Sequence, residues 1–91
     1  MPQVKRIVLD VLKPHHPNLL VFTTAIVEQC GDCQVRATVL EMDDKTETLE
    51  LVVEGDDIPF AAVQSAIEEM GGSLHSIDEV NVVGTPPVHA K

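Results

Sequence analysis

Apolar and polar residues alternate with a period of two in three stretches of the chain, and this pattern predicts a β-strand in each. The stretches are residues 4–13, 34–42 and 47–54. A fourth strand is expected over residues 73–83, where the facing of the side chains is mixed. The first stretch is apolar on both faces, and such a strand usually lies inside a sheet with both faces covered. We therefore expect residues 4–13 to form a central strand.

Two other stretches repeat their apolar residues at helical spacing, which predicts α-helices. Residues 18–29 are apolar nearly all round the helix, whereas residues 60–70 have one apolar face. Pro17 suits the start of the first helix, Gly31 suits its end, and Asp57 is expected to cap the second helix. A helix that is apolar on most sides is normally buried on more than one. Because a small domain buries only one side, another subunit is expected to cover the rest.

The expected order of elements is strand, helix, strand, strand, helix, strand. Right-handed crossovers then favour an α+β ferredoxin-like βαββαβ plait, a four-stranded antiparallel sheet in the order 4-1-3-2 with two helices on one face. Residues 1–83 would form this single domain and residues 84–91 a flexible tail. The residues expected at subunit contacts lie on the outer sides of the first helix and on the second face of the first strand: Leu20, Val21, Val27, Val8 and Leu12.

Charge and composition exclude several classes of function. The 91 residues carry a net charge of −9, with two Phe and no Tyr or Trp, so phosphate backbones are repelled and bases have little to stack on. We expect no nucleic-acid partner. No apolar run reaches the length of a signal peptide or the ~20 residues of a membrane span, so a cytoplasmic location without membrane contact is expected. No nucleophile elbow or phosphate-binding loop occurs, and an enzyme is not expected.

The plait sorts the candidate site residues between two ends about 30 Å apart. His15, His16 and His75 fall at one end, where one of the first two together with His75 could chelate an ion. The simpler interpretation is exposed loop histidines with a near-normal pKa. Cys30 and Cys33 fall at the other end, so a zinc site that combines cysteines with histidines in one subunit is not expected.

Cys30 and Cys33 stand at the C-terminal end of the first helix, whose negative dipole end disfavours a thiolate. In a cytoplasmic protein this spacing indicates free thiols or a metal-ligand pair more than a structural disulfide. We expect two inert thiols, with soft-metal binding or redox chemistry as the alternative.

Carboxylates suit hard cations such as Ca²⁺ or Mg²⁺, which makes a divalent cation the candidate cofactor. A plainer interpretation also holds: Asp57 caps a helix, Asp10 pairs with Arg6 or a base on a neighbouring strand, and Glu79 is solvated. The tentative metal ligands are Asp10, Asp56, Asp57, Asp78 and Glu79.

Three motifs occur in order along the chain: LDVLKPH at residues 9–15, EGDDI at residues 54–58 and GGSLHSIDEV at residues 71–80. With them the chain resembles the mainly archaeal domain-of-unknown-function family 211. The resemblance implies a ferredoxin-like fold that assembles into cyclic homo-oligomers. It implies no activity and supplies no catalytic residues.

The turn KPHHPNLL is also similar to the Pro-Gly-Leu-Leu segment of ACT regulatory domains, which bind amino acids between subunits; Asn18 stands in place of the glycine. The leading hypothesis is a non-enzymatic, ring-forming homo-oligomer that binds divalent cations. An amino-acid sensor and a thiol-based handler of soft metals are the alternatives.

Overall fold

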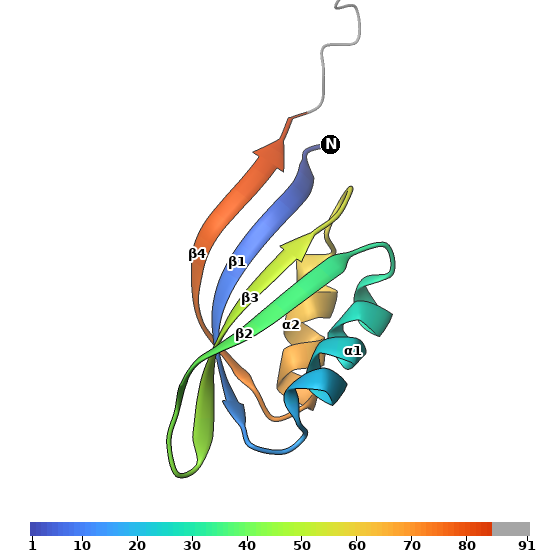
Figure 1. Ribbon diagram of the computed structural model, residues 1–91. Helices are drawn as coiled ribbons and strands as arrows, with labels where there is room; N and C mark the ends of the chain where they lie inside the picture. The colour runs from blue at the N-terminus through green and yellow to red at the C-terminus, as the bar shows by residue number, and fades with distance from the viewer. Residues whose placement is uncertain (85–91) are drawn as a thin grey trace, which may run out of the picture.

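The computed structural model describes residues 1–84, so all but the first residue of the expected tail at residues 84–91 lies outside the described residues. The sheet has the order β2-β3-β1-β4 with every neighbouring pair antiparallel. Read from the other edge, this is the expected order 4-1-3-2, and the α+β ferredoxin-like plait is confirmed (Figure 1). The elements are β1 (Gln3–Pro14), α1 (Leu19–Cys30), β2 (Gln34–Met42), β3 (Thr46–Glu54), α2 (Phe60–Glu69) and β4 (Ser73–Val83).

The core lies between the sheet and the two helices. On the helix side of the sheet, Leu9 of β1 stands opposite Leu51 of β3, and both are fully buried. Phe22 and Ile26 of α1 and Ile67 of α2 close over them, also fully buried. Burying one aliphatic or aromatic side chain of this size contributes about 1.5–3 kcal/mol. The expected central position of β1 is confirmed.

Local contacts set the ends of the helices. Asn18 caps α1, because its Oδ1 accepts a hydrogen bond from the backbone N–H of Val21 at 2.9 Å. Gly31 follows the helix with φ +83° and donates its N–H to the carbonyl of Val27 at 3.0 Å. The expectation that Asp57 caps α2 is wrong, because its Oδ1 accepts instead from the backbone N–H of Val4 at 3.3 Å. Pro59 holds the N-cap position without a side-chain hydrogen bond.

The sheet is longer than the helix layer. Figure 1 shows β1 and β4 continuing past the helices near the start of the chain, and the β2–β3 hairpin extending beyond them at the other end. On the face of the sheet that the helices do not cover, which we call the open face, Val8 and its partner Val52 are each only 6% exposed. Val8 was expected at a subunit contact, but other residues of the same chain already cover most of its side chain.

Candidate functional site

A largely buried ionic cluster lies at the end of the core next to the turn between β1 and α1. Lys13 is fully buried, and its Nζ donates to the carbonyl of Pro14 at 2.7 Å and to Oε1 of Glu47 at 3.1 Å. The same nitrogen lies 5.8 Å from the centre of the Phe22 ring, within range of a cation–π contact. Hydrogen bonds from His15 and Lys13 hold the pKa of Glu47 below its ordinary value. We call these residues the Lys13–Glu47–His15 cluster.

His15 completes the cluster with both ring nitrogens. Nδ1 lies 3.0 Å from Oε2 of Glu47, and Nε2 lies 2.9 Å from the backbone carbonyl oxygen of Asp43. A neutral imidazole has one N–H, so only the imidazolium donates to both oxygens. The hydrogen bond to Glu47, followed by that to Asp43, accordingly raises the pKa of His15. The expectation of an exposed histidine with a near-normal pKa is wrong for His15.

The alternation of residues in β1 and β3 contains a signal for the burial of Lys13 and Glu47. Lys13 is two residues after the buried Val11 and therefore points to the same, core-facing side of β1. Glu47 is two residues before the buried Leu49 and points to the core-facing side of β3. Two opposite charges on the core-facing positions of two strands indicate a buried pair whenever the strands are neighbours. Because Lys13 and Glu47 stand opposite each other in the β1–β3 register, the cluster anchors the turn to the hairpin.

The three candidate histidines do not gather into one site. His15 lies in the cluster, while the exposed His75 places Nδ1 3.2 Å from Oδ2 of Asp10 on the open face of the sheet. His16 is exposed, and its peptide bond to Pro17 is cis. The pairing of one turn histidine with His75 is therefore not present within the described chain.

Asn18 does not adopt the left-handed backbone that would suit an ACT-type ligand loop, because its φ is −69° and its side chain serves as the α1 cap. The amino-acid sensor stays a prediction that no contact in this turn supports.

The tentative metal ligands fall in separate places. Asp10 and Asp78 line a cavity of about 100 Å³ together with Glu50. Asp56 and Asp57 lie elsewhere, beside Cys30 and Cys33. Within residues 1–84, no three His, Cys, Asp or Glu side chains are placed to share one ion. A cation bound by this chain would therefore need further ligands.

The plainer interpretation of these carboxylates is also partly wrong, because Arg6 pairs with Glu54 at 2.7 Å and with Glu79 at 2.9 Å. Glu79 is thus ion-paired rather than solvated, whereas Asp10 pairs with His75, a base on the neighbouring strand β4, as this interpretation allowed.

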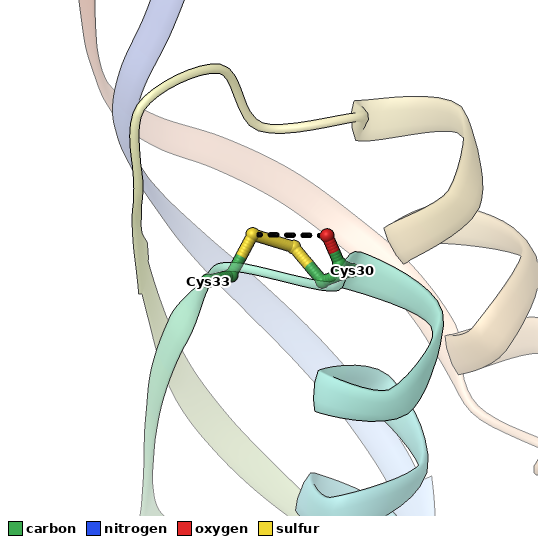
Figure 2. Close-up of a disulfide and its surroundings, with 2 residues drawn as sticks. All are labelled: Cys30 and Cys33. Atoms are coloured by element: carbon green, nitrogen blue, oxygen red, sulfur yellow. Dashed lines mark hydrogen bonds between the residues drawn. A yellow bond between two sulfur atoms is a disulfide. The ribbon is translucent and has the colours of Figure 1, made fainter.

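Cys30 and Cys33 form a disulfide, so the expectation of two free thiols is wrong (Figure 2). The left-handed turn at Gly31 folds the chain back after α1 and sets the two Cα atoms 5.6 Å apart, within the range that a disulfide spans. Compartment and spacing favoured thiols, but this local geometry brings the sulfurs together. Both cysteines line a cavity of about 340 Å³ with Asp32, Asp56 and Asp57 among its walls.

An apolar strip lies uncovered on β4. Ile77, Val80 and Val82 stand opposite Leu9, Ile7 and Val4, which places them on the helix side of the sheet. They are nevertheless 49%, 58% and 51% exposed, because this edge of the sheet runs beyond the helices (Figure 1). We call these three residues the β4 strip.

A second apolar surface lies on the outer side of α1, where Leu20 is 76% and Val21 50% exposed. We call these two residues the α1 patch. Val27, further along the helix, is half-buried, and Leu12 on the open face is 40% exposed. Since α1 packs beside β2 and β4 is the opposite edge strand, the α1 patch and the β4 strip face different sides of the molecule.

Across residues 1–84, neither helix is long and apolar enough to cross a membrane.

Comparison with known proteins places the chain in a family. The model of domain-of-unknown-function family 211, described as "Uncharacterized ArCR", matches residues 5–90. An uncharacterised protein of the archaeon Methanocaldococcus jannaschii is 40% identical over 80 residues, which cover 88% of this chain and 82% of that protein. The match extends over every element of the plait. The chain therefore belongs to domain-of-unknown-function family 211.

Proposed function

We propose that this protein is a non-enzymatic assembly module that forms a closed homo-oligomer through the β4 strip and the α1 patch. The observation that carries the proposal is the exposure of Ile77, Val80 and Val82 on the face of the sheet that is elsewhere the core. Adjacent apolar side chains left half-exposed are typical of a surface that another protein covers.

A second copy of the chain fits this surface because the α1 patch offers apolar side chains of the same kind at the opposite edge. Contact between two unlike patches is heterologous, so each copy keeps one free patch for the next. A row of copies joined in this way closes into a ring when a whole number of rotations between neighbours makes one full turn. The ring expected from the family resemblance would arise in this way.

Side-chain contact suits the β4 edge better than addition of a further strand. The pairing of β1 with β4 has three register shifts, near Lys5, Asp78 and His75. Irregularities of this kind bend an edge strand and make it a poor template for pairing with another strand. Covering a half-exposed Val or Ile would contribute roughly half of the 1.5–3 kcal/mol of full burial, so several such residues are needed for a stable contact.

The test is the mass in solution of the wild type and of charged variants, measured by size exclusion with light scattering. Val80→Lys places a charge in the β4 strip and Leu20→Asp places one in the α1 patch, and each should convert the oligomer to monomers. Asn81→Lys and Gln29→Asp are the matched controls, because both residues are exposed, Asn81 points to the other face of β4, and Gln29 lies on the opposite side of α1 from Leu20. A wild type that runs as a monomer would defeat the proposal, as would strip variants that keep their mass.

A divalent cation is a second element of the proposal, favoured by the cavity that Asp10, Glu50 and Asp78 share. No three carboxylates within residues 1–84 are placed to share one ion, so at most two of these would bind it, and water or a neighbouring copy would complete the coordination. Thermal melting of the wild type with added Ca²⁺ should show a higher midpoint than melting with a chelator. Asp78→Asn should remove most of that shift, while Asp44→Asn in the hairpin should retain it. Equal midpoints with and without Ca²⁺ would exclude the cation.

A further inference from the structure

The Cys30–Cys33 disulfide is open to solvent through the cavity at the end of α1. Cys30 is 8% exposed and Cys33 is half-buried, so the sulfur of Cys33 is the more accessible of the two. Gly31 has no atom within 4 Å of the place where a Cβ would stand, so the turn between the two cysteines is open, whereas Gly55 lies against the other side of Cys33. A small thiol can therefore approach Cys33 while the fold stays intact.

Negative charge surrounds this approach. Asp32, Asp56 and Asp57 line the cavity, and α1 ends there with the negative end of its dipole. Lys5 brings a cation to this rim, where its Nζ lies 3.8 Å from Oδ1 of Asp56. Because three carboxylates line the cavity, an anionic reagent meets repulsion and a cationic one attraction.

We propose that the Cys30–Cys33 disulfide is a thiol-exchange site that reacts with cationic or uncharged thiols in preference to anionic ones. The site is independent of assembly, because neither cysteine belongs to the β4 strip or the α1 patch.

The exchange runs in two balanced steps. A thiolate attacks Sγ of Cys33, the S–S bond breaks, and its electron pair leaves on Sγ of Cys30, which takes up a proton. A second thiolate then attacks the reagent's sulfur in the mixed disulfide and releases Cys33, which is protonated in turn. The protein gains two electrons and two protons, and two thiol molecules become one disulfide. The released Cys33 thiol has an acceptor at hand, since the carbonyl oxygen of Cys30 lies 3.7 Å from Sγ (Figure 2).

The test uses three thiols of similar size: cysteamine, 2-mercaptoethanol and 2-mercaptoethanesulfonate, which are cationic, neutral and anionic. Each is added to the native 91-residue chain at equal thiolate concentration, and the reduced cysteines are counted by alkylation and mass spectrometry. We expect cysteamine to react about tenfold faster than the sulfonate at low salt, with the ratio shrinking at high salt as the Debye length falls from ~10 Å at 0.1 M. Equal rates for the three thiols would overturn the charge selectivity, and reduction only in denaturant would overturn the exchange site itself.

Two sets of variants separate this site from general effects of charge and folding. Asp32→Asn with Asp56→Asn should reduce the preference for cysteamine, whereas Glu41→Gln with Asp44→Asn removes the same charge at the hairpin end and should leave it unchanged. Equal losses in both double variants would contradict the role of the rim.

Single-cysteine variants identify the attacked sulfur. The Cys33 thiol of Cys30→Ser should be alkylated faster than the Cys30 thiol of Cys33→Ser, because Cys33 is more exposed. Faster labelling of Cys30 would reverse the assignment of the attacked atom.

Discussion

Replacing Glu47 with alanine removes the carboxylate that joins Lys13 and His15 at the end of the core. The side chain of Lys13 is fully buried and that of Glu47 is 10% exposed, so the variant leaves an ammonium group out of water without its counter-charge. Two of its contacts, to the carbonyls of Pro14 and His15, remain as partial compensation. Breaking a buried ion pair by removing one partner costs about 3–5 kcal/mol.

We therefore expect Glu47→Ala to lower the free energy of unfolding by about 3 kcal/mol or more. A domain of this size has ~5–15 kcal/mol in total, so the change is easily measured. Urea unfolding followed by far-ultraviolet circular dichroism is the suitable assay, because the chain has no Trp or Tyr for fluorescence. Protein concentration must be held constant, since assembly adds to apparent stability.

Two further variants make this prediction refutable. Glu41→Ala removes an exposed carboxylate from β2 and should change stability by less than about 0.5 kcal/mol. The double variant Lys13→Met with Glu47→Leu replaces the pair with apolar side chains and should recover most of the loss. A loss below about 1 kcal/mol in Glu47→Ala would show that Lys13 finds water or another partner, which would refute the described burial.

Three other predictions concern single side chains. Because the pKa of His15 is raised in the folded state, its contribution to stability is complete below the ordinary pKa of 6.5 and is lost as the pH rises through the raised value. His15→Asn should flatten this decline of the unfolding free energy with pH, measured by denaturant titration at several pH values. An unchanged dependence on pH would contradict the two hydrogen bonds of the His15 ring. Asn18→Ala removes the α1 cap and should cost about 1 kcal/mol, whereas Asn18→Asp should retain most of it, both measured by urea unfolding. Gly31→Ala introduces a Cβ at φ +83° and should cost roughly 1–3 kcal/mol although the space around it is open; a neutral result would exclude the left-handed turn.

The fold was predictable because local pattern and topology agreed. Ile7, Leu9 and Val11 lie on the core face of β1 as their alternation predicts, and β1 is central as its two apolar faces required. The clean apolar face of α2 is likewise the face that is buried. These features depend on neighbours a few residues apart, which the sequence displays directly.

The site was less predictable because its contacts depend on register across distant segments. Lys13 and Glu47 meet over 34 residues of sequence, and their burial is evident only once β1 and β3 are aligned. Asp57 looks like a helix cap from its position before Pro59, yet the start of β1 competes for its carboxylate through Val4. For the cysteines, the expected cytoplasmic compartment favoured free thiols, but the turn at Gly31 determines the distance between the two residues and allows the disulfide.

The most direct test of the proposed assembly is native mass spectrometry of the 91-residue chain, with and without a chelator. The proposal predicts one discrete species at an integral multiple of the 9.9 kDa chain mass, which Val80→Lys converts to monomer and Asn81→Lys leaves intact. The difference in mass between the samples with and without chelator shows whether metal is bound. A monomeric wild type, or an oligomer unaffected by Val80→Lys, would contradict the assignment of the β4 strip as a contact between copies.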